Sequence, residues 1–193
     1  MADTTPTAVA PTAARPDARP DALPAPRPHT AAELATVLAL LTASEPPTAT
    51  VAIGHGRDDA SRAAARAFAG AWQARGGTVL SQVDWPEHAA SWLRPARRLT
   101  AQTPDAWVIA ADVLGFALLA RRLHRSTAFD PARTIAFASL ADPRLPALAG
   151  PGVLDGLRGA GTDGTTWAVH ADRLTRTPRQ DSRVVSACRR RRG

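Results

Sequence analysis

Polar residues that could contact a ligand follow the predicted strands of this chain. The first group is Gly54-His55-Gly56-Arg57, with Asp58 behind it, between a β-type run and a helical segment. Backbone N–H groups in such a loop, at the N-terminus of a helix, can hold an anion or a carboxylate. The same residues also fit an ordinary strand-to-helix turn, and both interpretations stay open.

Two later apolar runs are followed by carboxylates and a hydroxyl group. Asp112 could pair with a substrate ammonium group or cap the next helix. Asp142 stands before a proline, which also fits a helix cap followed by proline at the first helical position. The candidate ligand contacts are therefore Gly54, His55, Gly56, Arg57, Asp58, Asp112, Val113, Ser139 and Asp142.

The sequence predicts neither an enzyme nor a metal or cofactor site. Ser139 lacks the Gly-x-Ser-x-Gly elbow of a hydrolase, and no two of the five histidines show the His-x-x-x-His spacing of a metal site. The glycine loop would need a third glycine at position 59 to match a dinucleotide fingerprint, and Asp59 stands there. Cys188 is the single cysteine, which excludes an internal disulfide.

Alternating strands and helices would position these residues. Apolar β-type runs are predicted at 50–53, 78–83, 106–110, 134–138 and 166–169. Helical periodicity is predicted at 30–41, 61–75, 91–99 and 113–125, and shorter helical pieces at 141–149 and 153–158. The first helix opens on Thr30 and Glu33, which have the spacing of a capping box.

This alternation predicts an α/β fold with a doubly wound, mostly parallel sheet and helices on both faces. Strands that alternate with helices of this length form right-handed βαβ units. Continuously apolar strands are typical of sheets covered on both sides. Ligands of such sheets bind beyond the carboxyl ends of the strands, where the candidate residues lie.

Composition divides the chain into three parts. Residues 1–28 are rich in proline and alanine and are predicted to form a disordered leader. Residues 29–172 form the predicted α/β lobe, and residues 173–193 a flexible, arginine-rich tail.

The net charge of +7 does not indicate a nucleic-acid partner. All 24 basic residues are arginine, as biased coding composition would produce, and four of them stand together at 189–192. Without those four the net charge is about +3, which is ordinary for a small domain.

The order of the elements resembles the second lobe of type I periplasmic binding proteins, the branched-chain amino-acid-binding kind. The resemblance covers about residues 29–170 and is most specific at Ser91-Trp92, the Leu93–Leu99 helix and the run Pro104-Asp105-Ala106-Trp107-Val108-Ile109. It implies a single lobe that binds a small polar ligand, such as an amino acid, for transport or sensing with an ABC transporter. A separate first lobe, a permease or another protein would be its partner.

Two alternatives to this function remain open. One is a structural or regulatory interaction domain that keeps the fold without the ligand, and the other is a nucleotide-using enzyme of Rossmann-like fold.

As written, the N-terminus lacks the basic and apolar regions of a signal peptide, and no apolar run is long enough to span a bilayer. The chain is therefore predicted to be cytoplasmic, or extracytoplasmic if it is a fragment of a longer receptor.

Overall fold

The described part of the chain builds one sheet with helices on either side. The computed structural model describes residues 22–86 and 91–177. The strands are β1 (Thr50–Gly56), β2 (Thr78–Trp85), β3 (Ala106–Ala110), β4 (Thr134–Ala136), β5 (Arg158–Ala160), β6 (Thr166–His170) and β7 (Arg173–Thr177). The helices are α1 (Ala31–Thr42), α2 (Asp59–Gln73), α3 (Leu93–Thr100), α4 (Val113–Ser126) and α5 (Leu145–Ala149), with 3₁₀ turns η1 (Pro131–Arg133) and η2 (Ala138–Leu140).

The sheet is mostly parallel, as predicted. Its strands lie in the order β2-β1-β3-β4-β5-β6-β7. The first five strands pair in parallel, whereas β6 and β7 pair antiparallel along one edge. The strand order reverses between β1 and β3, and this reversal is the point beyond which doubly wound sheets hold their ligands.

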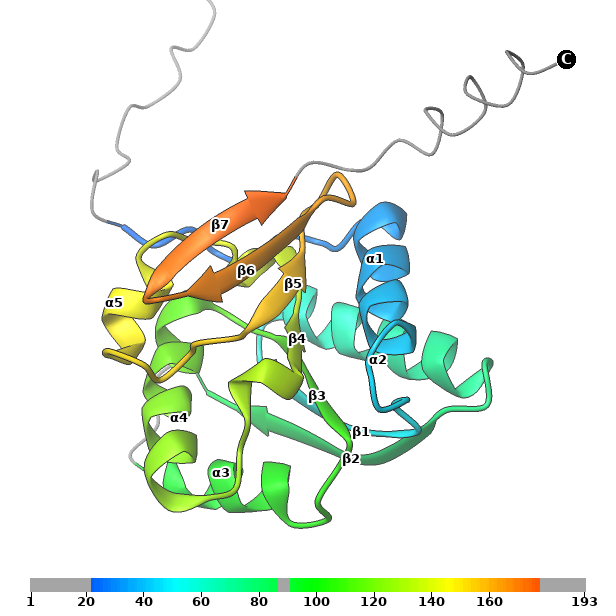
Figure 1. Ribbon diagram of the computed structural model, residues 1–193, viewed down its shortest axis with the longest axis horizontal. Helices are drawn as coiled ribbons and strands as arrows, with labels where there is room; N and C mark the ends of the chain where they lie inside the picture. The colour runs from blue at the N-terminus through cyan, green and yellow to red at the C-terminus, as the bar shows by residue number, and fades with distance from the viewer. Residues whose placement is uncertain (1–21, 87–90, 178–193) are drawn as a thin grey trace, which may run out of the picture.

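Helices cover both faces of the sheet (Figure 1). Alternate side chains of a strand point to opposite faces, so Val51 and Ile53 of β1 pack in the cluster of α1 and α2, while Ala52 belongs to the cluster of α3, α4 and α5. Phe68 of α2 and Phe116 of α4 are both fully buried and lie in these opposite layers. The doubly wound architecture with two helical layers is thereby confirmed.

Three helix caps within the described residues use the side chains of Thr30, Asp58 and Asp112, whereas Asp142, a predicted cap, is not the N-cap of α5. Thr30 and Glu33 form the capping box of α1, Asp58 accepts the N–H of Ser61 at the start of α2, and Asp112 accepts the N–H of Gly115 at the start of α4. The caps at Asp58 and Asp112 fix the points at which the chain leaves the carboxyl edge of the sheet after β1 and β3.

Several local predictions were wrong. Residues 54–56 were predicted as a loop and belong to β1, and Arg158 was predicted to end a helical piece and instead opens β5. The predicted fourth strand stops at Ala136 and continues into η2. Ser91 was predicted to cap the third helix, but α3 has Trp92 at its N-cap and no side-chain cap hydrogen bond.

The folded part extends beyond both predicted boundaries. Residues 173–177, predicted as part of the flexible tail, form β7 and pair with β6. Leu23, predicted in the disordered leader, packs against the core cluster of α3, α4 and α5. Cys188 and the arginines at 189–192 lie outside the described residues. No helix within 22–86 and 91–177 is long and apolar enough to cross a membrane.

Candidate functional site

Two hollows lie side by side at the carboxyl edge of the parallel strands. The first, here called the α2 cavity, holds about 330 Å³ of space. The second, here called the switch-point groove, holds about 620 Å³ next to the loops after β1 and β3. Pro24, Ala25, Ala60, Ser61, Ala64, Phe137, Ser139, Ala141 and Asp142 are among the residues that line the α2 cavity.

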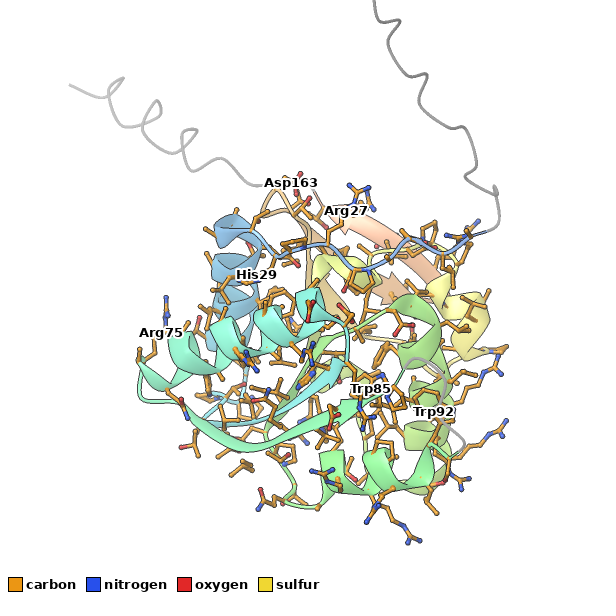
Figure 2. The ribbon with its side chains drawn as sticks, turned by 180° about the vertical axis from the view of Figure 1, so that it is seen from behind. Arg27, His29, Arg75, Trp85, Trp92 and Asp163 are labelled. Carbon is orange, nitrogen blue, oxygen red and sulfur yellow. The ribbon has the colours of Figure 1, made fainter. Side chains whose placement is uncertain are left out.

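The segment before α1 separates the two hollows. Pro24, Ala25 and Pro26 line both of them. In Figures 1 and 2 this blue segment crosses from the side of α5 to α1, with Arg27 and His29 labelled in Figure 2. Residues 23–27 are here called the crossing segment. They lie at the carboxyl edge of the sheet, where the predicted ligand cleft opens.

Four of the predicted ligand contacts lie in the switch-point groove: Arg57, Asp58, Asp112 and Val113. Asp58 Oδ1 accepts the Ser61 N–H at 2.8 Å, and Asp112 Oδ1 accepts the Gly115 N–H at 2.6 Å. Both carboxylates therefore cap a helix, which is the role that the sequence left open for Asp112.

Arg57 at the mouth of this groove is also engaged. Its Nε donates to Asp84 Oδ2 at 2.5 Å, and this hydrogen bond lowers the pKa of the Asp84 carboxyl. Val113, by contrast, is buried and belongs to the core cluster of α3, α4 and α5. The polar groups of the groove thus already have partners in the chain itself.

Gly54, His55 and Gly56 belong to β1 and line neither hollow. A Cβ on Gly54 would stand 2.8 Å from the ring of Trp85, so the position is one of close packing. His55 Nδ1 lies 2.7 Å from the Gly56 carbonyl oxygen, and its Nε2 lies 3.1 Å from Gln82 Nε2. These contacts fit a neutral ring whose Nδ1–H donates to the carbonyl and whose Nε2 accepts from the amide.

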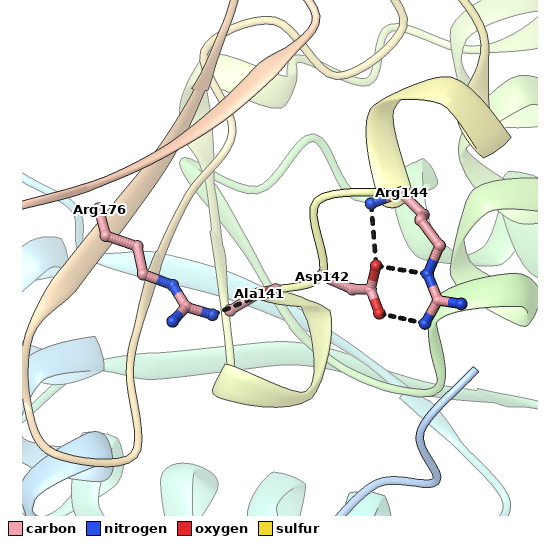
Figure 3. A network of polar contacts seen from close by, with 4 residues as sticks. All are labelled: Ala141, Asp142, Arg144 and Arg176. Carbon is pink, nitrogen blue, oxygen red and sulfur yellow. Dashed lines mark hydrogen bonds and ion pairs between the residues drawn. The ribbon is translucent and has the colours of Figure 1, made fainter. Parts of the chain in front are cut away.

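The remaining two predicted contacts, Ser139 and Asp142, lie in the α2 cavity. Asp142 is bound by its neighbour Arg144 through both side-chain oxygens, with Nε 3.0 Å from Oδ1 and Nη2 2.8 Å from Oδ2 (Figure 3). The Arg144 N–H also donates to Oδ1 at 2.8 Å. These hydrogen bonds hold the pKa of the Asp142 carboxyl below its ordinary value.

Glu33 reaches the α2 cavity from α1 and joins α1 to η2, the turn that follows β4. Its side chain is only 3% exposed. Oε1 accepts the Ala138 N–H at 2.6 Å, and Oε2 accepts the Thr30 N–H at 3.3 Å. Burial raises the pKa of Glu33, against the opposing effect of these two hydrogen bonds.

Ser61 supplies a polar group without a partner. The residue is 2% exposed, and its Oγ makes no hydrogen bond within the described chain. It stands in the first turn of α2 and lines the cavity. A buried hydroxyl of this kind costs free energy until an acceptor or donor meets it.

Sequence reasoning missed the functional possibilities of Ser61 and Glu33. Glu33 was considered only as part of the capping box of the first helix, and Ser61 was not among the candidate contacts. Arg176 was missed because it was placed in the tail, whereas β7 brings its Nη2 to 3.0 Å from the Ala141 carbonyl oxygen beside the cavity. Within 22–86 and 91–177 no group of three or more His, Cys, Asp or Glu side chains could hold a metal ion.

Comparisons with known proteins place the fold. No protein-family model and no curated protein sequence matches the chain. Among solved structures, the chain is similar to a putative branched-chain amino acid ABC transporter protein from Rhodospirillum rubrum, with 21% identity and a TM-score of 0.57 over 68% of this chain and 37% of that one.

Two further solved structures give the same result. A substrate-binding protein of an ABC transporter from Aeropyrum pernix is 24% identical, with a TM-score of 0.56 over 69% of this chain and 35% of that chain. An extracellular ligand-binding receptor from Rhodopseudomonas palustris is 18% identical, with a TM-score of 0.59 over 69% and 36%. The chain therefore spans little more than a third of these proteins, and its fold is that of one of their lobes. None of these three neighbours is described as an enzyme.

Proposed function

We propose that this chain is a recognition domain that binds a small polar molecule in the α2 cavity and makes or breaks no bond in it. The observation that carries the proposal is the cavity itself, at the carboxyl edge of a doubly wound sheet. Such edges hold the ligands of this fold class because loops and helix N-termini converge there.

The cavity has the properties of a small-molecule site. Its 330 Å³ lies at the lower end of the roughly 300–1,000 Å³ typical of ligand pockets. Alanine and proline side chains form much of its wall, while Ser61, Ser139 and Asp142 supply a few polar groups. An apolar wall with a few polar groups binds the body of a ligand and fixes its orientation.

The similar structures support recognition for transport or sensing. They are described as transporter, substrate-binding and ligand-binding proteins. Because the chain corresponds to one lobe, we propose a separate first lobe or a permease as its partner. The description of one neighbour as extracellular fits the extracytoplasmic alternative for a fragment and gives no support to the cytoplasmic prediction.

A ligand screen tests the proposal. Thermal unfolding of the full chain is followed with amino acids, small organic acids and their amine and amide analogues at millimolar concentration. A bound ligand raises the melting temperature, because it binds the native state only. We expect at least one compound to do so, and no shift with any compound would contradict the proposal.

Two tryptophan variants of the same helix locate the binding. Ala60 lines the α2 cavity, so Ala60→Trp fills it and should abolish the shift. Ala63 is exposed on the same helix, and Ala63→Trp is the matched control that should keep the shift. A ligand that binds both variants equally would place recognition elsewhere.

A further inference from the structure

Helices α3 and α4 carry a cluster of arginines without a carboxylate among them. The six arginines, here called the α3–α4 basic face, are Arg94, Arg97, Arg98, Arg121, Arg122 and Arg125. The rest of the described chain has ten arginines and twelve aspartates and glutamates, so its charges nearly balance. Coding bias explains why the basic residues are arginine, but it does not explain why these two helices lack acidic residues.

The two helices lie side by side on one face of the sheet. Each follows a strand that ends at the carboxyl edge, and each runs back to the amino edge. Ala96 and Leu99 of α3 pack in the same core cluster as Leu119 and Leu123 of α4. The arginines lie on the outer sides of the helices, where all are exposed except the half-buried Arg122. Figure 2 shows nitrogen-bearing side chains that extend outward from both helices.

The charge of this face is not paired within the described part of the chain. None of its six arginines forms an ion pair there. Arg121 Nε donates to the Ala149 carbonyl oxygen at 3.2 Å, which leaves its charge in place. Asp105 and Asp130, which follow the two helices, accept hydrogen bonds from Thr50 and from a backbone N–H instead.

The arrangement opposes the stability of its own helices. Arg94 and Arg98 are four residues apart on α3, as are Arg121 and Arg125 on α4, and like charges at this spacing repel each other. Arg94 also stands in the first turn of α3, where the helix dipole disfavours a cation. A negatively charged partner would relieve both effects.

The shape of the face favours a flat partner over the groove of a nucleic acid. Both helices pack on the sheet along their apolar sides, so neither projects from the surface as a recognition helix does. Neither helix has an exposed Phe, Tyr or Trp side chain on which a base could stack. Arginine donates two parallel hydrogen bonds to a phosphate group, and a bilayer surface presents phosphates in a plane.

We infer that the α3–α4 basic face docks on a bilayer surface that contains anionic phospholipids. The contact is electrostatic, between guanidinium groups and lipid phosphates, and it inserts no helix into the bilayer. None of the six arginines lines the α2 cavity or the switch-point groove. The inference therefore goes beyond the proposed function and does not depend on it.

Vesicle binding tests the inference. The full chain is mixed with vesicles of phosphatidylcholine alone, or of phosphatidylcholine and phosphatidylglycerol in equal parts, and the bound fraction is measured by co-sedimentation. We expect binding to the anionic vesicles at low salt and little binding to the neutral ones, because basic residues are attracted by the negative surface potential. Salt at about 0.5 M should release most of the bound chain, since it screens exposed charges.

Two triple variants with the same loss of charge locate the contact. The face variant carries Arg94→Gln, Arg97→Gln and Arg98→Gln, and the control variant carries Arg62→Gln, Arg66→Gln and Arg75→Gln, at exposed positions in and just after α2 in the opposite layer. We expect affinity for the anionic vesicles to fall about tenfold or more in the face variant and less than about threefold in the control. The tail arginines are present in both variants, so their contribution cancels.

A lysine variant separates charge from folding. Lysine at positions 94, 97 and 98 should keep most of the affinity, because a membrane surface responds to charge. The melting temperature of the face variant should not fall, since the replaced side chains are exposed and repel one another.

Three results would overturn the inference. The first is a wild-type chain that does not bind the anionic vesicles, and the second is equal weakening in the face and control variants. The third is a short DNA duplex that binds the wild-type chain more tightly than the vesicles do and the face variant more weakly, because the face would then serve a nucleic acid.

Discussion

The two hollows at the carboxyl edge use similar polar residues in different ways. In the switch-point groove, the carboxylates of Asp58 and Asp112 accept N–H groups of the first turns of α2 and α4. In the α2 cavity, Ser61 keeps a buried hydroxyl without a partner within the described chain. A polar side chain near the end of a strand is therefore available to a ligand only where the following helix does not already use it as a cap.

Glu33 and Asp112 differ in how far along the chain their hydrogen-bond partners lie. Asp112 accepts an N–H three residues away, which any N-cap does. Glu33 accepts the N–H of Ala138, 105 residues away, and so ties α1 to η2, the turn after β4. Changes on the cavity side should therefore cost more stability than changes on the groove side.

The largest effect is expected from Glu33→Ala. The change leaves the partly buried N–H groups of Ala138 and Thr30 without their acceptor, and each such loss costs roughly 1–3 kcal/mol. We expect the free energy of unfolding to fall by about 2–4 kcal/mol, as measured by urea denaturation. Glu45→Ala, at an exposed carboxylate, should stay within about 0.5 kcal/mol.

A pH series with Glu33→Gln tests whether the buried carboxyl of Glu33 contributes to the pH dependence of stability. Burial raises the pKa of Glu33 above its ordinary value of 4.5, so the native state holds this proton more tightly than the unfolded state. The wild-type protein should therefore lose stability relative to the variant as the pH rises from about 4.5 through the raised pKa, and no further above it. A stability difference between the wild-type protein and the variant that stays constant over this pH range would contradict the raised pKa of Glu33.

A smaller effect is expected from Gly54→Ala. Its methyl group would stand 2.8 Å from the Trp85 ring and 3.0 Å from the Ile109 side chain, and overpacking of this kind costs about 1–3 kcal/mol. The effect should be on stability, with ligand binding unchanged, because Gly54 lines neither hollow.

Gly70→Ala is the matched control for this change. Its Cβ would meet nothing within 4 Å on α2, so alanine should stabilise the helix by about 0.5–1 kcal/mol. A Gly54→Ala protein that is fully stable but fails to bind ligand would restore Gly54 to the binding site.

Asp112→Ala should cost about 1 kcal/mol, the usual value of a lost N-cap. Asp112→Ser should recover most of this loss, because a serine hydroxyl can also accept the N–H of Gly115. Calorimetry with a ligand found in the thermal screen should give the same affinity for both variants. If Asp112→Ala strongly weakened the affinity and Asp112→Ser restored neither the stability nor the affinity, the groove would be part of the ligand site.

The sequence was sufficient for the parts of the fold that depend on local pattern. The apolar run at 106–110 matches β3, and the capping box at Thr30 and Glu33 starts α1. Strands covered on both faces have continuous apolar runs, and caps have fixed spacing, so both can be recognised without tertiary contacts.

The parts that depend on distant contacts were not predictable. β5 has three residues, and Gly159 lies so close to the ring of Trp167 that a Cβ there would stand 2.3 Å away. Leu23 belongs to a proline-rich stretch whose composition indicates disorder, yet it packs on the core. Likewise, the pattern that places Ser61 in a helix does not show that a cavity opens beside it.

The smallest effect is expected from Arg57→Gln at the mouth of the switch-point groove. Arg57 and Asp84 form an ion pair, and their side chains are 59% and 40% exposed. Exposed pairs contribute about 0–1 kcal/mol, because water screens them and ordering two side chains costs entropy. We expect a change of no more than about 0.5 kcal/mol in urea denaturation, smaller still at high salt.

The ligand affinity of this variant decides whether the two hollows act separately. Arg57 contributes positive charge next to the crossing segment, as Arg27 does from the segment itself. If the ligand lies in the α2 cavity, Arg57→Gln should leave its affinity unchanged, whereas Arg27→Gln should change it. An equal change in both variants would show that the crossing segment does not divide the edge, and that the ligand draws on both hollows together.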